Sequence, residues 1–593
     1  MMLAKLTAIE DAVLGLKGEL MKMRESRESG AAETPRTEEG ASPQSAASTM
    51  VSQATVQSAA LNADQKMGIH ARDDTTGGTV YLGRNSVPAF IRLGNQGNPK
   101  GSSSGGLGQD YPLQVFGLHN STVTYPFAQL WSSQVDMSEI ARALPSDAEL
   151  MRYFTVYRKV AHRIYPVIAD IDKFGMDVRN SMRERTTSKG SDTSPNSRWK
   201  NPSWMALLFA TLASGTQFSD DPREERELSS RVFVCCSFQC LRIANFFIQP
   251  TTEQIQSLLL LGNCIRNDTN PGAAWILLGL TIRLAQSIGL HQKSSSLDPD
   301  TQELHRKIWW SVMWQDALLS FSYDRPHGAV TMDCGVPHPT STEPSIHFMD
   351  LMYAFLRVVI DFSLHADVHH SNPPPSSTIQ HFTARLTHIR QQARHNHLDQ
   401  LERLTMRIHT GYIISQICRV VLRRPSDDHP DPSTDYTATC LEHSADVIHA
   451  FLEMHTLSSA IVRSWAFMHN VLSCALLLGL IPDALKKTET RTLLGRMIGC
   501  LEEIEADAGG ECYAKSLAAL KDIYESRVAF GGSVEEAQGE LRDRYVGDTG
   551  GVGKGPSGGR NDEVYGADVG AATDAAAVWE SKIMDSIIWG WKG

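Results

Sequence analysis

NPGAAWILLGLTIRLAQSIGLHQKSSSLDPDTQELHRKIWWSVMWQDALLSFSYDRPHGAVTMDCGVPHP, residues Asn270–Pro339, predicts two consecutive helices. Asn270 is a favourable N-cap, and Pro271 suits the first helical position because its missing N–H leaves no bond unmade there. Gly289 is expected to close the first helix. Its apolar residues recur at helical spacing, in the rows Trp275, Leu278, Ile282, Ala285 and Leu277, Leu284, Ile288.

The second helix is expected to open at Asp298–Pro299 and to end before Pro326. Only a narrow stripe of it is polar, and Glu303 is placed to support Lys307 one turn later. Large apolar residues, three tryptophans among them, fill the rest of the segment. The pattern therefore predicts a buried helix pair within an all-α core. The polar stripe consists of Glu303, Lys307, Ser311 and Gln315.

The same stretch resembles the fungal-specific transcription factor domain, the middle homology region of fungal binuclear zinc-cluster regulators. The resemblance rests on the ordered motifs AW-x-L-x-G-x-x-IRLAQS-x-GLH, R-x-x-WWS, D-x-x-LS and RP. Asp324 departs from it, because the family usually has Gly before Arg-Pro. We hypothesise that Asp316 and Arg325 pair and lock the end of the second helix. The family-motif core is Trp275, Arg283, Gln286, His291, Trp309, Trp310, Asp316, Arg325 and Pro326.

The resemblance implies a fungal transcription factor that acts in the nucleus on RNA polymerase II transcription. Family members bind promoter DNA through an N-terminal cluster in which six cysteines hold two zinc ions. This chain has no cysteine before Cys235, so the zinc cofactor has no ligands here. Two alternatives follow: the sequence begins downstream of the cluster, or the protein is a cluster-less regulator that dimerises with DNA-binding relatives and inhibits them.

Bulk composition narrows the function further. The chain has 593 residues, 41% hydrophobic and 21% charged, with a net charge of -11 and a pI of about 6.0. An acidic chain does not bind DNA by overall charge, because phosphate binding needs a basic face.

No signal peptide begins the chain, and the apolar run Val471–Ile481 is too short to span a bilayer. We expect a reduced, intracellular protein without membrane contact, whose cysteines are buried free thiols.

Residues 1–24 show a heptad spacing that is typical of a short dimerising coiled coil. The alternative is an amphipathic helix that packs on its own domain. A coiled coil predicts a homodimer. The expected dimer seam is Leu6, Ile9, Val13, Leu16 and Leu20.

The expected fold class is all-α, with one large multi-helix domain between disordered arms. The predicted map is 1–24 coiled coil, 25–110 mostly disordered linker, 111–530 helical regulatory domain, 531–577 Gly-rich linker and 578–593 amphipathic segment. Within the linker, Val80–Ile91 resembles the family's LG-x-NSVP element and is apolar enough to dock. The C-terminal segment is expected either to dock on its own domain or to fold on a coactivator or corepressor.

Further helices are expected along the domain, with capping boxes at Ser146–Glu149 and Thr251–Gln254. The first of them is predicted to run into Tyr165–Pro166 and to end at Phe174, followed by a polar loop from Arg183. The predicted ranges are 146–176, 201–220, 225–247, 251–266, 346–366, 377–424, 436–457, 462–480, 487–508 and 511–528.

Three patterns that suggest other functions are discounted. Asp220, Asp221 and Glu224 form DD-x-x-E, part of the magnesium-binding signature of helical terpene synthases, but Pro222 interrupts it. GGVGKG at 550–555 lacks the first Gly and the Ser or Thr of a P-loop, and His365 and His369 lack the Glu of a zinc protease. We therefore expect no catalytic residue, no metal site and no enzyme.

Overall fold

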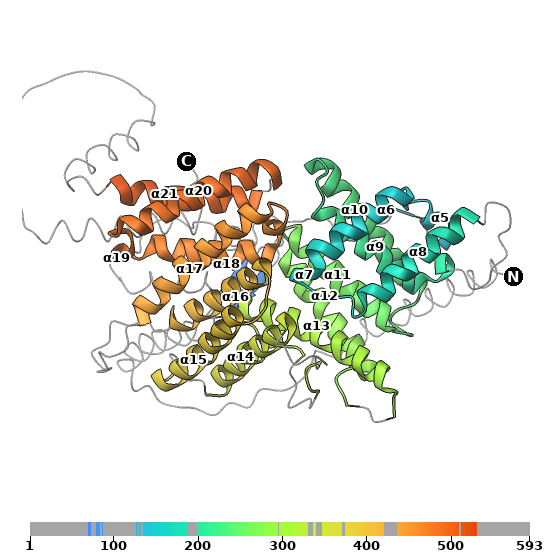
Figure 1. Ribbon diagram of the computed structural model, residues 1–593, viewed down its shortest axis with the longest axis horizontal. Coiled ribbons are helices and arrows are strands. Elements are labelled where there is room, and N and C mark those ends of the chain that lie inside the picture. Colours follow the sequence, from blue (N-terminus) through green and yellow to red (C-terminus); the bar gives the residue numbers. More distant parts are fainter. Residues whose placement is uncertain are drawn as a thin grey trace, which may run out of the picture. The chain divides into compact units, whose positions relative to one another are not determined.

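The computed structural model (Figure 1) describes the helical part of the chain. Every described residue belongs to the unit 64–593. The predicted dimer seam at 6–20, the P-loop-like segment and the C-terminal segment therefore lie outside the described residues. These are 69–72, 79–83, 86, 126–128, 130–131, 135–187, 198–293, 296–329, 336–339, 347–369, 374–419, 436–508 and 511–529.

The described chain is all-α, as predicted, apart from one small sheet. The first half of the domain consists of helices up to and including the predicted pair, α12 and α13. The predicted helix starts at Asn270 and Asp298 are confirmed, since each accepts a backbone N–H of the first turn. Asn201 caps α9 in the same way. Both predicted capping boxes are present. The elements are α5 Met137–Ala141, α6 Asp147–Val156, η2 Tyr157–Ala161, α7 His162–Ile164, α8 Ile171–Thr187, η3 Arg198–Lys200, α9 Pro202–Gln217, α10 Arg223–Ile243, α11 Thr252–Asn267, α12 Pro271–Ser287 and α13 Pro299–Tyr323.

The second half continues with helices that pack on their neighbours in chain order. Figure 1 shows α14 beside α15 and α16, and these pairs are in contact. The predicted range 436–457 is confirmed at both ends, and 487–508 and 511–528 to within one residue. The elements are α14 Phe348–His369, α15 Ser376–His395, α16 Gln400–Arg419, α17 Tyr436–Leu457, η5 Ile461–Arg463, α18 Trp465–Leu480, α19 Pro482–Leu485, α20 Thr488–Ala508 and α21 Glu511–Ala529.

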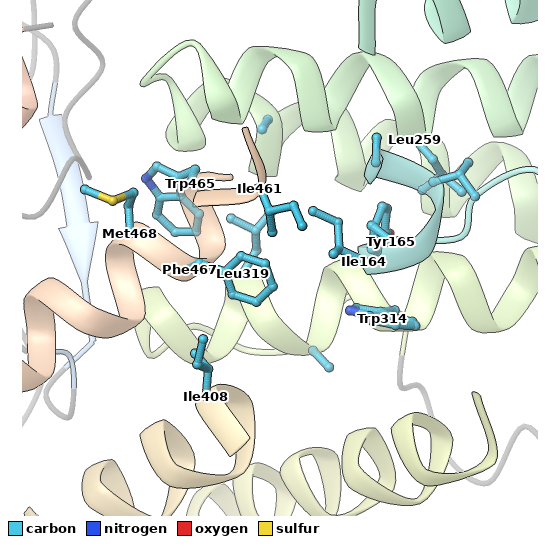
Figure 2. Close-up of a cluster of buried hydrophobic side chains, with 14 of the residues drawn as sticks. Ile164, Tyr165, Leu259, Trp314, Leu319, Ile408, Ile461, Trp465, Phe467 and Met468 are labelled. Atoms are coloured by element: carbon cyan, nitrogen blue, oxygen red, sulfur yellow. The ribbon is translucent and has the colours of Figure 1, made fainter. Parts of the chain in front are cut away.

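A continuous apolar core joins the two halves. Figure 2 shows side chains from distant segments gathered in it, among them Tyr165, Trp314 and Trp465. The Trp314 and Tyr165 rings meet edge to face with their centroids 5.3 Å apart. Tyr165 donates its hydroxyl to the carbonyl of Ser311 at 2.9 Å. The helix pair that the opening stretch predicts thus lies inside the core, as its composition indicates.

The segment before α9 differs from the prediction of one helix over 146–176. The helix ends at Ile164, because a residue before proline is pushed out of the helical region, and Tyr165 before Pro166 has φ -151 and ψ 85. A new helix, α8, then starts at Ile171 and continues through Phe174, the expected end, to Thr187. Five residues of the predicted polar loop, 183–187, are therefore helical.

The predicted single helix over 377–424 is wrong as well, since α15 and α16 are two helices. Asn396 leaves the helical conformation with ψ 164. Asp399 then caps α16: its carboxylate accepts the N–H of Glu402 at 3.0 Å, and the Glu402 carboxylate accepts the N–H of Asp399 at 3.0 Å. This reciprocal pair satisfies backbone groups that a continuous helix would bond internally, so it favours a new start.

Only part of the polar stripe of α13 is exposed to solvent. Lys307 is exposed, but Ser311 and Gln315 are buried, and Gln315 donates to the carbonyl of Leu259 at 2.8 Å. Glu303 pairs with Arg306 at 3.0 Å, whereas the sequence predicted support for Lys307. The stripe therefore satisfies backbone groups of neighbouring helices inside the core.

One short sheet lies within the predicted disordered linker. Strands β1 (Ile69–Arg72) and β2 (Thr79–Leu82) pair antiparallel, with His70 opposite Tyr81. The linker was predicted to be mostly disordered, and β2 falls largely within the apolar island that was expected to be the exception. The expected docking of the apolar island that begins at Val80 is confirmed for its described residues, because Leu82 is fully buried.

Candidate regulatory junction at the end of helix α13

Helix α13 ends in a left-handed turn that places Arg325. Asp324 has φ 50 and ψ 54, and its N–H bonds the carbonyl of Phe321 at 3.1 Å. The N–H of Arg325 bonds the carbonyl of Ser320 at 2.8 Å. This pair of bonds is a Schellman motif, in which the left-handed position favours Gly and tolerates Asp. The departure at Asp324 therefore leaves the turn intact, because Asp here adopts the left-handed conformation that Gly favours.

The Arg325 guanidinium lies between two aromatic rings. Its central carbon is 4.5 Å from the centroid of the Trp275 ring and 4.1 Å from that of Tyr323, both within range of a cation–π interaction. Its Nε and Nη2 both donate to the backbone carbonyl of Tyr81, at 2.9 and 2.6 Å. Burial lowers the pKa of Arg325. The rings and the backbone turn thus fix a guanidinium that recognises a strand through its main chain.

The end of β2 completes this contact. Gly83 donates its N–H to the carbonyl of Tyr323 at 2.8 Å, and a Cβ at residue 83 would overlap the carbonyl oxygen of Asp324. Ser86 donates its hydroxyl to the carbonyl of Gly83 at 2.8 Å and closes the following turn. Only glycine permits this approach of two backbones. We call Tyr81, Gly83, Trp275, Tyr323 and Arg325 the Arg325 junction.

Asp316 does not pair with Arg325, so that hypothesis is wrong. Its carboxylate accepts the N–H of Ala329 at 2.8 Å and the hydroxyl of Ser320 at 3.2 Å. The indole N–H of Trp275 in turn reaches the Ser320 hydroxyl at 3.3 Å. Asp316 therefore holds the loop that follows Arg325 and leaves the guanidinium to the strand. The spacing of the two residues could not separate these roles, because both lie near the same helix end.

The other predicted motif residues divide between core and surface. Trp309 is fully buried, with its ring centroid 5.9 Å from that of His291. Trp310 is 3% exposed and donates to the carbonyl of Pro337 at 3.1 Å. Arg283 is exposed on α12 and donates to Gln286 at 2.9 Å, and Pro326 is exposed. The structure thus brings Trp275, Asp316 and Arg325 together and leaves Arg283, Gln286 and Pro326 outside the junction.

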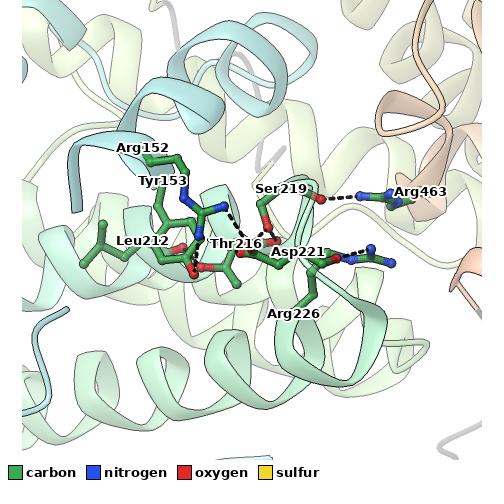
Figure 3. Close-up of polar contacts among 8 residues, drawn as sticks. All are labelled: Arg152, Tyr153, Leu212, Thr216, Ser219, Asp221, Arg226 and Arg463. Atoms are coloured by element: carbon green, nitrogen blue, oxygen red, sulfur yellow. Dashed lines mark hydrogen bonds and ion pairs between the residues drawn. The ribbon is translucent and has the colours of Figure 1, made fainter. Parts of the chain in front are cut away.

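The acidic motif DD-x-x-E forms a structural network instead of a metal site (Figure 3). Asp221 receives two bonds from Arg152, at 2.6 and 3.0 Å, and one from the Ser219 hydroxyl at 2.9 Å. Arg226 donates to the backbone carbonyl of Asp221, and Arg463, from the second half of the domain, to that of Ser219. We call these five residues the Asp221 network. The arginine that Asp221 needs could not be identified from the sequence, because it lies 69 residues earlier.

The cysteines of the described part do not fit the zinc cluster of the family. Cys236 and Cys240 are fully buried and free, as expected, and burial raises the pKa of both thiols. A zinc ligand must be a thiolate, so the raised pKa opposes binding. Within the described ranges, no three His, Cys, Asp or Glu side chains lie close enough to hold a metal ion. None of the described helices is long and apolar enough to cross a membrane.

The sequence analysis missed three residues of the Arg325 junction: Tyr81, Gly83 and Tyr323. Tyr81 contributes its carbonyl, which any residue carries, so no sequence signal marks it. Gly83 carries a signal, because an isolated Gly after an apolar strand pattern marks a close backbone approach. The Asp399–Glu402 box was also detectable, since D-x-x-E at a helix start resembles the two boxes that were recognised.

Comparison with known proteins places this helical region in a family. Residues 155–392 match the fungal specific transcription factor domain. The transcription factor yanR of Aspergillus niger is 28% identical over 211 residues, which are 33% of this chain and 25% of that protein. The transcriptional regulator AacuB of Aspergillus aculeatus is 25% identical over 273 residues, 42% of this chain and 35% of that protein. The lactose regulatory protein LAC9 of Kluyveromyces lactis is 24% identical over 208 residues, 33% of this chain and 21% of that protein.

The matched segments span at most about a third of the length of these relatives. One solved structure, the K. lactis CBF3 core, aligns with a TM-score of 0.48 and 11% identity over 74% of this chain and 96% of that chain.

The motifs of α12 and α13 lie inside the range that matches the family, residues 155–392, as does the Arg325 turn. Residues 155–392 of this chain therefore belong to the family of fungal specific transcription factor domains.

Proposed function

We propose that this protein is a fungal transcription factor that acts in the nucleus on RNA polymerase II transcription through its helical domain. The observation that carries the proposal is the match of residues 155–392 to a transcription factor domain. The similarity to the transcription factor yanR and to the transcriptional regulator AacuB supports it. In this role the chain has no enzymatic activity, and its partners are a second copy and a coactivator or corepressor. Promoter DNA is the partner expected for the full family architecture, but residues 1–593 alone do not support it, because no cysteine precedes Cys235.

The Arg325 junction suggests how the domain exerts control. It holds β2, the second strand of the small sheet, against the turn that ends α13. In the proposed protein, the dimer seam at Leu6–Leu20 and the DNA-reading part lie N-terminal to this strand. The junction then sets whether the N-terminal region is tied to the helical domain or released from it. Arg325 acts as a positioning residue for β2.

A second function rests on the absence of cysteine before Cys235. A chain with the dimer seam and the helical domain but without zinc ligands would dimerise with a DNA-binding relative and inhibit it. The two functions make opposite predictions for a co-expressed relative: the first leaves its reporter unchanged, and the second lowers it.

The test joins the full chain to a heterologous DNA-binding domain upstream of a reporter gene. We expect reporter expression to change at least severalfold relative to the DNA-binding domain alone. The Arg325→Ala fusion, at equal protein level, should shift that expression further, whereas Arg283→Ala, an exposed arginine outside the junction, should behave as wild type. An unchanged reporter, with the fusion present in the nucleus, would contradict the proposed function.

A further inference from the structure

A small cavity lies at the opposite end of the α12–α13 pair from the Arg325 junction. It has a volume of about 40 Å³ and is formed where α12 ends and α13 begins. Its apolar wall includes Leu290, Leu297 and Val336, and its polar wall includes Gln292, Lys293 and Arg306. Leu290 is buried directly after Gly289, whose φ of 78 turns the chain out of α12. The cavity is therefore built by the turn that closes α12.

The charges that line this cavity are positive. Lys293 is exposed and makes no ion pair with a described residue, whereas Arg306 pairs with Glu303 at 3.0 Å. His305 also lines the cavity, and burial lowers its pKa, so it is mostly neutral near pH 7. Among the described residues that line the cavity, none is a carboxylate. The nearby acid Asp298 is directed to the backbone of Thr301, which it caps at 2.9 Å.

The size of the cavity limits what it can hold. A single water needs about 10–15 Å³ of such volume, so the site holds the equivalent of about three waters. That matches the head group of a carboxylate or a phosphate, with its remainder outside. A lysine and an arginine are the side chains that bind such oxyanions, and an apolar wall suits a short hydrocarbon segment beside the head group.

We propose that this cavity, which we call the Lys293 site, binds a small metabolite through a carboxylate or phosphate head group held by Lys293 and Arg306. The ligand would contact both α12 and α13. These helices run antiparallel, since Leu290 and Arg306 meet at the cavity and Trp275 and Ser320 meet at the junction. The Lys293 site and the Arg325 junction thus lie at opposite ends of one helix pair, and α13 has 25 residues, about 37 Å of helix.

The test measures binding to the purified full chain. Sodium butyrate and sodium phosphate are each titrated at constant ionic strength against sodium chloride, with the melting temperature and titration calorimetry as readouts. We expect one of the two oxyanions to raise the melting temperature in a saturable manner that chloride does not reproduce. Butyrate as the stronger ligand would identify a carboxylate with a hydrocarbon segment, and phosphate a phosphate head group.

Matched variants locate the binding. Lys293→Gln should weaken the oxyanion affinity at least tenfold, whereas Lys307→Gln removes the same charge from an exposed position outside the cavity and should not. Arg306→Gln serves as a second variant, accepted only where circular dichroism matches wild type. Chloride acting as well as both oxyanions, or Lys293→Gln binding with unchanged affinity, would overturn the proposal. Binding is measured without DNA or a reporter, so this result does not depend on the proposed function.

Discussion

The Asp221 network, which lies near Gly215, and the Arg325 junction, which includes Gly83, each occur beside a glycine at a close backbone approach, yet their arginines bind different kinds of partner. In the network, Arg152 binds a carboxylate, and a Cβ on nearby Gly215 would overlap the carbonyl of Tyr153. In the junction, Arg325 binds a main-chain carbonyl, and a Cβ on Gly83 would overlap that of Asp324. The first arrangement joins core helices, and the second holds one short strand.

This difference teaches where disruption should spread. The network links α6, α9 and α10 to the second half of the domain through Arg463, so its loss affects the whole fold. The strand β2 belongs to a two-stranded sheet, which has little stability of its own. Release of β2 should therefore leave most contacts between the helices intact. The network is therefore expected to govern global stability, and the junction local attachment.

The largest effect is expected from Gly215→Ala in α9. The added Cβ must displace the backbone at Tyr153, since no flexible side chain can move away, and we expect a loss of about 3 kcal/mol. Gly279→Ala in α12 is the matched control, because its Cβ meets no atom within 4 Å and should stabilise the helix by about 0.5–1 kcal/mol. Urea unfolding measures both. If Gly215→Ala and Gly279→Ala changed the free energy of unfolding equally, the close approach of α9 to the backbone of Tyr153 in α6 would not matter for stability.

Asp221→Asn should have an intermediate effect of about 1–2 kcal/mol, because Asp221 is 12% exposed but Arg152 is 42% exposed to solvent. A double-mutant cycle with Arg152→Met should give a coupling of about 1 kcal/mol in urea unfolding. Burial opposes ionisation of Asp221, but hydrogen bonds from Arg152 and Ser219 outweigh it and lower its pKa below 3.8. This stabilisation is therefore complete above the unfolded-state pKa and is lost as the pH falls below it.

The pH dependence offers an independent check on that cycle. The difference in unfolding free energy between wild type and Asp221→Asn should be constant near neutral pH and shrink towards pH 3. A difference that grows on acidification would mean that Asp221 is not held as a paired carboxylate.

Gly83→Ala should have the smallest global effect, below about 1 kcal/mol, together with a large local one. The Cβ would push β2 away from the α13 turn, so the backbone N–H of residue 83 should lose its bond to Tyr323. We expect its hydrogen exchange to accelerate at least tenfold, while amides of α9 and α11 keep their rates. If Gly83→Ala lowered the free energy of unfolding as much as Gly215→Ala, the Arg325 junction would govern global stability as well, and the two regions would not differ.

The sequence could predict most of the fold because the relevant signals are local. Asn270 with Pro271, Gly289, and Asp298 with Pro299 mark helix ends through backbone groups within a few residues, and the structure confirms them. The errors occurred where a local rule was given too little weight. Pro166 separates two helices that share one apolar period, and Asp399 starts a helix within a continuous helical pattern.

The candidate site could be predicted only in part because its bonds are not local. Trp275, Asp316 and Arg325 were identified from a motif, but the partner of Arg325 is a carbonyl 244 residues away. Burial of Leu82 was foreseeable from its apolar surroundings, whereas the Arg325–Tyr81 bond was not. The expected Asp316–Arg325 pair shows the limit of the method: opposite charges at nearby positions do not reveal which backbone groups each one satisfies.

Hydrogen exchange of Arg325→Ala in the full chain tests the central claim most directly. Removing the guanidinium deletes both bonds to Tyr81 while the α13 turn keeps its own backbone bonds. We expect faster exchange across residues 79–83 and unchanged protection in α9, α11 and α13. Unchanged exchange at 79–83, or loss of protection throughout α13, would mean that Arg325 does not hold this strand to the helical domain.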